Sequence, residues 1–216
     1  MIKACIFDLD GVIVDTAKYH YLAWKRLATE KLDFNFTEHQ NERLKGVSRM
    51  ASLDILLELS SKNISQEDKI AFASKKNSWY IQYVSRMTPE EILPGVMSFL
   101  TLLKETGIKI GLGSASKNAG LILKQINMGG FFDAVIDGNQ VTRAKPDPEV
   151  FLKAASALQT PPDECAVFED AASGVEAAKN GGMTSIGVGS PEILGRADLV
   201  ISGFKDIGLD LLDRFR

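Results

Sequence analysis

The sequence lacks an apolar run approaching the roughly 18 residues that a membrane-spanning helix needs. It also lacks a basic N-terminal segment followed by an apolar stretch and a cleavage site, and its net charge of −3 gives no basic footprint for nucleic acid. Its two cysteines, Cys5 and Cys165, both fall in apolar, strand-like runs, where buried thiols are the simplest interpretation. We therefore expect a cytoplasmic protein without a membrane or nucleic-acid partner, although the sequence leaves a disulfide open.

The amino-acid composition is typical of a globular protein. Hydrophobic residues make up 45% of the 216 residues and charged residues 25%. This length suits one large domain or two small ones. The sequence shows no internal repeat and no low-complexity stretch, so the organisation has to be inferred from its hydrophobic periodicity.

The periodicity changes along the chain. Residues 16–86 carry helical patterns and almost no strand signal, whereas apolar strand-like runs alternate with helical patterns from residue 88 onward. Alternating strands and helices favour a parallel sheet with right-handed crossovers. We expect an α/β fold: a Rossmann-like core formed by residues 1–15 and 88–216, and an inserted all-α cap formed by residues 16–87. The strands of the core are expected at residues 3–8, 109–112, 134–136, 165–168, 184–188 and 199–201.

The first expected strand ends in a pair of carboxylates. Asp8 and Asp10 are two residues apart and Gly11 follows at once. On an extended chain, residues i and i+2 point the same way, and ligands of open α/β sheets bind beyond the carboxyl ends of the strands. One carboxylate could attack phosphorus while the other moves a proton, with a cation between them and the phosphate.

Other strands of the core are also followed by polar residues. Ser114 follows one strand and could bind an anion or simply cap a helix. Lys145 lies in a proline-rich loop and could neutralise phosphate or remain a solvated surface lysine. Glu169 and Asp170 follow another strand, where they suit a hard cation such as Mg²⁺ or respond to the dipole of the next helix.

Each of these signals is weak alone, but their order is specific. An Asp-x-Asp, then a serine, a lysine and an acidic pair, each at a strand end, resembles the haloacid dehalogenase (HAD) superfamily of phosphotransferases and phosphatases. The resemblance implies that Asp8 is the nucleophile, Asp10 the general acid–base, and that Ser114 and Lys145 hold the transferring phosphate. It further implies one Mg²⁺ placed by Asp8, the Asp10 backbone carbonyl, Glu169 and Asp170.

Residues of the helical insert should distinguish a phosphatase from a mutase, because the core residues are common to both. Lys45, Gly46, Ser48 and Arg49 could bind a second phosphate of a phosphosugar, and arginine is the better phosphate ligand because it binds in a bidentate manner. The alternative is a helix-ending glycine with solvated charges. The motif also includes Leu44 and Val47, with Ser52 just beyond it, and Lys76 and Asn77 lie farther along the insert.

The first helix of the insert adds three candidates. Thr16 and His20 are four residues apart and share a helix face, so they could hold Asp10 or the hinge until the cap closes. A lone histidine is more often structural. Trp24, one turn on, fits the core of the cap better than a platform for the sugar, although we keep it as a candidate contact.

Core and insert together resemble the β-phosphoglucomutase family. The residues that carry this resemblance are Asp8, Leu9, Asp10, Thr16, His20, Trp24, 44–49, Lys76, Asn77, Ser114, Ala115, Ser116, Lys117, Asn118, Lys145, Glu169 and Asp170. The resemblance implies interconversion of β-D-glucose 1-phosphate and glucose 6-phosphate through β-glucose 1,6-bisphosphate, which serves as activating intermediate. Substrate contacts are then expected from Asp10, Trp24, 45–49, Ser52, Lys76 and 114–118.

Two other functions remain open. A sugar-phosphate phosphatase on the same scaffold would release inorganic phosphate, but it has less need of the cations Lys45, Arg49 and Lys76. A non-catalytic phosphate sensor would have little use for the complete set of acids. The sequence shows no dimer signature, so we expect a monomer that acts on a phosphosugar substrate.

Overall fold

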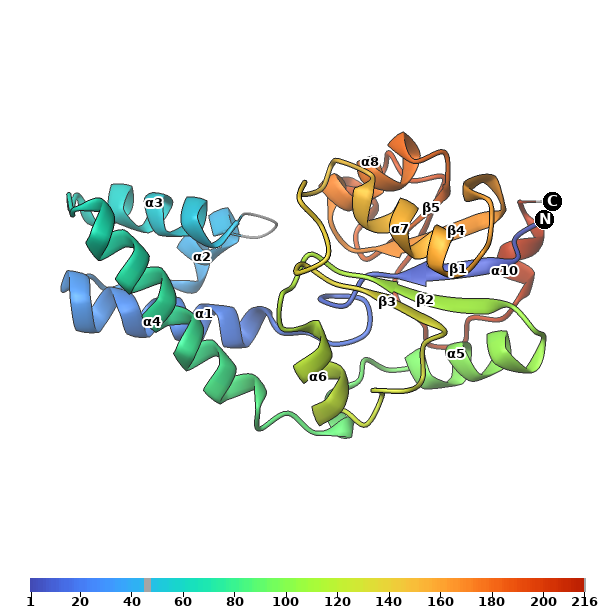
Figure 1. Cartoon of the computed structure of the whole chain (residues 1–216), viewed down its shortest axis with the longest axis horizontal. Coiled ribbons are helices and arrows are strands. Elements are labelled where there is room, and N and C mark those ends of the chain that lie inside the picture. Colours follow the sequence, from blue (N-terminus) through green and yellow to red (C-terminus); the bar gives the residue numbers. More distant parts are fainter. Residues whose placement is uncertain (45–47, 216) are drawn as a thin grey trace. The chain divides into compact units, whose positions relative to one another are not determined.

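The computed structural model describes residues 1–44 and 48–215 of the chain. The chain folds as two compact units (Figure 1): residues 1–15 together with 87–216 form the core unit, and residues 16–86 form the helical unit. The sequence places the second boundary one residue later, after residue 87. None of the helices in the described ranges combines the length and apolar character of a membrane span.

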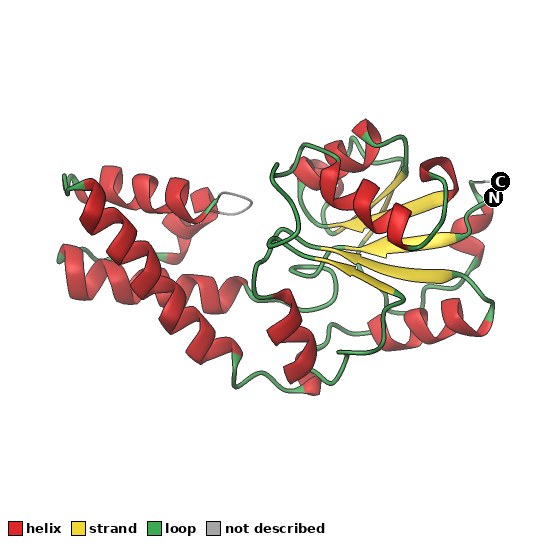
Figure 2. Ribbon diagram, viewed as in Figure 1, coloured by secondary structure: helices red, strands yellow, loops and turns green. Residues whose placement is uncertain are grey.

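The core unit is built on a parallel sheet (Figure 2) with the strand order β3-β2-β1-β4-β5-β6. Every pairing in this sheet is parallel. The strands are β1 (Ala4–Phe7), β2 (Lys109–Gly113), β3 (Ala134–Ile136), β4 (Cys165–Glu169), β5 (Thr184–Val188) and β6 (Leu199–Ile201). The predicted α/β class with a parallel sheet and an inserted helical segment is therefore confirmed.

Helices join these strands and cover the sheet. Their bounds are α5 (Val96–Glu105), α6 (Ala119–Gln125), α7 (Glu149–Ala157), α8 (Ala172–Asn180), α9 (Pro191–Leu194) and α10 (Asp210–Asp213). Two 3₁₀ turns, η2 (Pro89–Glu91) and η3 (Pro162–Glu164), precede α5 and β4. Because helical crossovers cover both faces of a parallel sheet, its central strands β1 and β4 are buried on both sides and are apolar up to Glu169, which ends β4.

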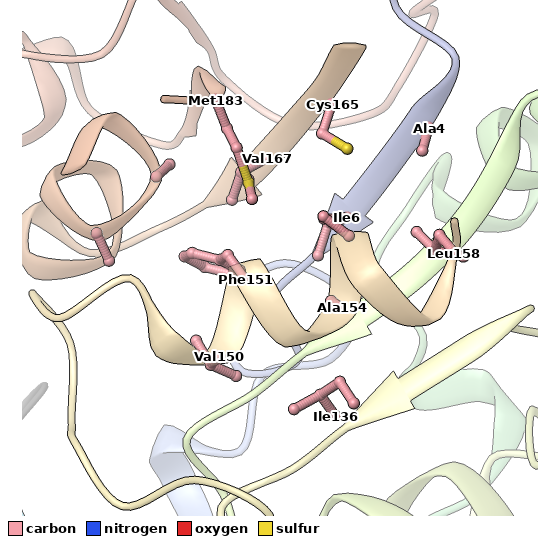
Figure 3. Packing of buried hydrophobic residues seen from close by; sticks show 13 residues of the cluster. Ala4, Ile6, Ile136, Val150, Phe151, Ala154, Leu158, Cys165, Val167 and Met183 are labelled. Atoms are coloured by element: carbon pink, nitrogen blue, oxygen red, sulfur yellow. The ribbon is translucent and has the colours of Figure 1, made fainter. Parts of the chain in front are cut away.

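One face of the sheet packs against α7 and α8. Figure 3 shows Ile6 and Val167, from the two central strands, facing Phe151 and Ala154 of α7. Cys165 lies on this same face, in register with Ala4 of β1. Cys5 is the next residue along β1, so its side chain points to the opposite face, and both thiols are free and buried. The predicted buried thiols are confirmed.

The opposite face of the sheet carries an aromatic cluster. The rings of Phe7 on β1 and Phe168 on β4 stack with centroids 4.6 Å apart. Phe99 from α5 meets the Phe168 ring edge-on at 5.5 Å, and Phe204 lies 5.6 Å from it. Packing of this kind adds to the burial of large apolar surfaces and fixes the carboxyl ends of β1 and β4 side by side.

The helical unit consists of α1 (Ala17–Leu32), α2 (Glu38–Asn41), the 3₁₀ turn η1 (Glu42–Leu44), α3 (Arg49–Ser60) and α4 (Gln66–Val84). Side-chain caps begin several of these helices: Ser48 accepts from Ala51 N, and Ser65 accepts from Asp68 N. The cap at Ser48 explains why α3 starts at Arg49. Trp24 and Leu27 of α1 are buried in this unit, as are Trp79 and Tyr80 of α4.

Candidate active site

Asp8 and Asp10 lie directly beyond the carboxyl end of β1. The backbone N–H of Asp8 donates to the carbonyl of Phe168 at 3.0 Å, which extends the strand pairing to this residue. The carboxylate of Asp8 is almost fully buried, whereas Asp10 is half-buried. Gly11 then turns the chain with a φ of +77°, a conformation that favours glycine.

Lys145 reaches this strand end from a distant part of the chain. Its ammonium lies 2.5 Å from Asp8 Oδ1 and 3.0 Å from Glu169 Oε1. The side chain of Lys145 is only 9% exposed, and its ammonium also lies 4.6 Å from the centroid of the Phe151 ring. The solvated surface lysine that the sequence left open is therefore wrong for this residue.

The charge on Lys145 is retained despite its burial. Loss of water by itself lowers the pKa of an ammonium, but the carboxylates of Asp8 and Glu169 outweigh this effect and raise the pKa of Lys145. Because both carboxylates also accept hydrogen bonds from it, the ammonium is fixed between two strands of the sheet.

Carboxylate oxygens of Asp8, Glu169 and Asp170 lie within 4.8 Å of one another. Burial, together with the charge of neighbouring carboxylates, raises the pKa of Glu169 and Asp170, even though Asp170 is exposed as a whole residue. Lys145 supplies one positive charge to this concentration of negative charge. Hard oxygen ligands at these separations suit a small divalent cation, so the donor set fits the predicted metal site.

Two glycines leave room for the acidic pair. A Cβ at Gly174, in the first turn of α8, would overlap Glu169 Oε1, and a Cβ at Gly11 would overlap Asp170 Oδ2. Glu169 Oε2 also accepts the backbone N–H of Asp170 at 2.9 Å. Glu169 closes β4, and α8 begins only at Ala172, so this pair belongs to the strand end more than to the helix dipole.

Ser114 follows β2, the strand next to β1. It is 1% exposed, its N–H donates to the Ile136 carbonyl at 3.0 Å, and its Oγ accepts the N–H of Ser116 at 3.1 Å. Because α6 begins at Ala119 with Asn118 in the N-cap position, Ser114 is not the cap of that helix. The segment 114–118 forms a compact loop of consecutive side-chain turns at the carboxyl end of the sheet.

A neighbouring loop supports this segment from behind. Asn139 donates from Nδ2 to the Lys117 carbonyl at 3.0 Å, and Gly138 N–H donates to the Ser116 carbonyl at 3.2 Å. A Cβ at Gly138 would overlap the Ala115 carbonyl oxygen. No sequence pattern identifies Gly138 and Asn139, because their contacts depend on the way two loops meet.

His20 and Lys76 form a buried pair inside the helical unit. Lys76 Nζ lies 2.8 Å from His20 Nδ1, and it sits 4.8 Å from the Trp24 ring centroid. Because an ammonium can only donate, His20 accepts at Nδ1 and its neutral ring carries the proton on Nε2. Burial, followed by the charges of Lys76 and Arg49, lowers the pKa of His20 well below its ordinary value.

This arrangement bears on two predicted substrate contacts. Trp24 is 2% exposed and Lys76 also 2% exposed, and both belong to the interior of the helical unit. The expectation that Trp24 fits the core of the cap agrees with its burial. A contact of either side chain with a sugar phosphate stays a prediction, as does the predicted role of Thr16 and His20 in holding Asp10.

Three of the remaining predicted residues of the insert lie at the start of α3. Ser48 is its N-cap, Arg49 is its half-buried first residue, and Ser52 is buried one turn on. Thr16 occupies the N-cap position of α1 and is fully buried. Lys45, Gly46 and Val47 lie outside the described residues, so their predicted substrate contacts stay predictions.

The fold and the acidic strand ends define an α/β enzyme with a helical insert after its first strand. Residues 2–182 match the haloacid dehalogenase-like hydrolase family, and the chain belongs to this family. It is similar to a β-phosphoglucomutase of Bacillus subtilis, with 44% identity over 212 residues, which covers 97% of this chain and 93% of that protein.

Two further similarities bear on the choice of reaction. A crystal structure of β-phosphoglucomutase from Clostridium difficile superposes with a TM-score of 0.90 and 42% identity, covering 100% of this chain and 97% of that one. A phosphorylated carbohydrates phosphatase of Thermotoga maritima is 33% identical over 186 residues, covering 85% of this chain and 83% of that protein. The similarity to the mutases of B. subtilis and C. difficile is thus stronger than that to this phosphatase and extends over more of the chain.

Proposed function

We propose that this enzyme is a β-phosphoglucomutase, which interconverts β-D-glucose 1-phosphate and glucose 6-phosphate. The observation that carries the proposal is the ion pair of Lys145 with Asp8 beside Glu169 and Asp170, in a chain 44% identical to a β-phosphoglucomutase. The buried acids support phosphoryl transfer through an aspartyl-phosphate, and the full-length similarity favours a mutase over a phosphatase.

Asp8 is the proposed nucleophile. Its carboxylate extends from the end of a rigid, fully buried strand, and Lys145 lies where it can neutralise the equatorial oxygens of a phosphoryl group. Ser114, at the end of the neighbouring strand, is the proposed hydroxyl donor to the same phosphoryl group. Phosphoryl transfer depends mainly on positioning and charge neutralisation, and the interior of the core unit provides both.

Asp8, Asp170, Glu169 and the Asp10 carbonyl are the proposed ligands of one Mg²⁺. When bound, Mg²⁺ would neutralise negative charge on the transferring phosphate. Burial, and after it the charge of neighbouring carboxylates, raises the pKa of Glu169 and Asp170, and a divalent cation would offset the cost of keeping both groups ionised there.

Asp10 is the proposed general acid–base. In the forward reaction, phosphorylated Asp8 would donate its phosphoryl group to the 6-hydroxyl of β-glucose 1-phosphate while Asp10 accepts the proton of that hydroxyl. The resulting β-glucose 1,6-bisphosphate would then present its 1-phosphate to Asp8. Asp10 would protonate the leaving oxygen, so that glucose 6-phosphate departs and phosphorylated Asp8 is regenerated.

The phosphate that is not reacting needs a second binding site. We assign Arg49 to it as the bidentate ligand. Arg49 is suited to this role because its guanidinium is half-buried at the start of α3 and therefore partly desolvated. This requirement for a second phosphate site separates a mutase from a small-molecule phosphatase.

The proposal is tested by following two products in one reaction. Purified protein is incubated with Mg²⁺, β-glucose 1-phosphate and a trace of β-glucose 1,6-bisphosphate, and glucose 6-phosphate and free phosphate are measured together. We expect glucose 6-phosphate in large excess over phosphate, with a rate that depends on the bisphosphate. Equal release of glucose and phosphate would instead establish a sugar-phosphate phosphatase, and no turnover of any phosphate ester would favour a sensor.

A further inference from the structure

Lys145 belongs to an irregular segment between β3 and α7, residues 142–148, which we call the lysine loop. The loop carries the ammonium that pairs with Asp8 and Glu169, so the position of that ammonium depends on the path of the loop. None of its residues is in a helix or strand, and Arg143 and Ala144 are exposed. Contacts with residues other than the proposed catalytic ones must therefore hold the backbone of the lysine loop in place.

The entry of the lysine loop is tied to one carboxylate. Glu149 Oε2 accepts the backbone N–H of Thr142 at 2.9 Å, the Thr142 hydroxyl at 3.0 Å and the backbone N–H of Arg143 at 2.8 Å. A carboxylate oxygen that accepts several donors at once is a strong anchor for a loop. Because Glu149 is the first residue of α7, this anchor joins the loop to a helix packed on the sheet.

The other oxygen of the same carboxylate has a different partner. Glu149 Oε1 pairs with Lys153 at 2.7 Å, one helical turn along α7. Hydrogen bonds from Lys153 and from the Arg143 backbone lower the pKa of Glu149 to about 2. The carboxylate of Glu149 is thus ionised at any pH near neutrality. Its Oε2 accepts the hydrogen bonds from the lysine loop, and its Oε1 pairs with Lys153 at the surface.

The second half of the lysine loop is held by α8. Asn180 donates from Nδ2 to the carbonyl of Pro146 at 3.0 Å, and the backbone N–H of Glu149 donates to Asp147 Oδ1 at 3.0 Å. Arg143 and Asp147 also form an ion pair across the loop at 2.9 Å. Lys145 therefore lies between two anchored points, one on each side of it in the sequence.

We infer that Glu149 is a positioning residue for phosphoryl transfer, which acts through Lys145, and that Asn180 assists it in this role. The inference rests on the proposed role of Lys145 in holding the transferring phosphate. Neither residue touches Asp8 or Glu169 in the contacts described above. Displacing a group by about 1 Å can cost about a hundredfold in rate, so a loop anchor can matter as much as a direct contact.

A double-mutant cycle tests whether Glu149 acts through Lys145. The variants Glu149→Ala, Lys145→Met and the double variant are compared with the unaltered enzyme, with saturating Mg²⁺ and acetyl phosphate as phosphoryl donor. Phosphate release from acetyl phosphate requires Asp8 to be phosphorylated but requires no sugar. The assay therefore gives a clear result whether the enzyme is a mutase or a phosphatase, and failure of the proposed mutase reaction would not be mistaken for failure of this inference.

We expect Glu149→Ala to lower kcat/KM by about tenfold or more when Lys145 is present, and by less than about twofold in the Lys145→Met protein. An equal loss in both backgrounds, or no loss in either, would overturn the inference. If Glu149 has only a structural role, Glu149→Ala should lower kcat/KM by the same factor in both backgrounds, because a general loss of folded structure does not depend on Lys145.

Two further variants separate the loop contacts from the ion pair. Lys153→Met removes the partner of Oε1, and with it a hydrogen bond from Lys153 Nζ to the Gln140 carbonyl at 2.6 Å, but it leaves the contacts of Oε2 with residues 142 and 143. Its kcat/KM should therefore stay near that of the unaltered enzyme. Glu149→Gln retains an oxygen that can accept from the loop, more weakly because it is neutral, and should lose no more than about threefold. If Lys153→Met were as slow as Glu149→Ala, the ion pair would be the cause and the inference would be wrong.

Asn180→Ala keeps the test decisive if Glu149→Ala does not fold. It removes one hydrogen bond at the protein surface, a change that a folded protein usually tolerates. We expect a measurable loss of kcat/KM that again disappears in the Lys145→Met background. The same loss in both backgrounds would contradict the role assigned to the lysine loop.

Discussion

The ammonium of Lys145 lies 2.5 Å from Asp8 Oδ1, although the two residues are far apart in the sequence. If this pair prepares Asp8 and its phosphoryl group for transfer, Lys145→Met should reduce the rate of phosphate release from acetyl phosphate by about a hundredfold or more, as loss of a charged transition-state contact commonly does. Lys153→Met, which removes an exposed lysine from α7, is the matched control. A Lys145→Met enzyme as fast as this control would contradict the role of the pair.

Gly174→Ala tests the packing behind the acidic pair. A Cβ at this position would overlap Glu169 Oε1, so the carboxylate must move away from Asp8 and Lys145. Displacing a metal ligand or its support commonly costs about tenfold to a hundredfold in metal affinity, and we expect the Mg²⁺ concentration at half-maximal activity to rise accordingly.

Gly120→Ala is the control for that substitution. A Cβ at Gly120 of α6 meets nothing within 4 Å, and alanine is favoured over glycine in a helix by about 1 kcal/mol. Its Mg²⁺ dependence should match the unaltered enzyme while its stability rises. If Gly174→Ala shows an unchanged Mg²⁺ dependence as well, Glu169 is not a ligand held by this contact.

The buried His20 should make the stability of the protein depend on pH. Its pKa is low in the folded state because of burial and the charges of Lys76 and Arg49, while the unfolded chain has the ordinary value of 6.5. Between these two values the unfolded state binds more protons, so the contribution to stability is complete above pH 6.5 and is lost as the pH falls towards the folded pKa. The free energy of unfolding, measured by urea titration at several pH values, gives this slope.

His20→Gln should flatten the pH dependence below pH 6.5 relative to the unaltered protein, because glutamine does not titrate. His39 is exposed on α2 and supplies the control. His39→Gln should leave the slope unchanged. An identical slope for all three proteins would show that the His20–Lys76 pair does not control the acid stability.

Arg49 should affect the binding of a phosphosugar more than the chemistry at Asp8. Loss of a charged, bidentate contact to the second phosphate should raise KM for β-glucose 1-phosphate by about tenfold or more. The rate of phosphate release from acetyl phosphate, which has no second phosphate, should change little. Arg43→Ala, which removes an exposed arginine paired with Glu58, is the control; a KM of Arg49→Ala equal to that of the control would remove Arg49 from the site.

Much of the sheet could be predicted because its strands are short apolar runs between polar loops. The bounds expected for residues 134–136, 184–188 and 199–201 coincide with β3, β5 and β6. Helix starts were less predictable. The starts of α3 at Arg49 and of α8 at Ala172 depend on caps and tertiary contacts, which decide the first turn of a helix. The short helix α10 carries too few residues for a periodic signal.

The acids of the candidate site could be predicted because the carboxyl ends of parallel strands meet at one edge of a sheet. Asp8 and Glu169 follow from this rule alone, and the structure brings Lys145 to them. Glu149 and Asn180 could not be predicted in the same way, because their partners are loop backbone atoms that no residue pattern identifies. Gly174 has no side chain and so leaves space for the carboxylate of Glu169. This contact depends on the tertiary structure and cannot be predicted from the sequence.

In the proposed reaction, each glucose 6-phosphate receives its phosphate from Asp8 and not from its own 1-position. The decisive measurement uses β-glucose 1-phosphate labelled with ¹³C in the sugar and ¹⁸O in the phosphate, mixed with unlabelled substrate and a trace of bisphosphate. We expect glucose 6-phosphate in which the sugar and phosphate labels are randomly re-paired, with little free phosphate. Product that keeps both labels together, or label that appears mainly in inorganic phosphate, would contradict it.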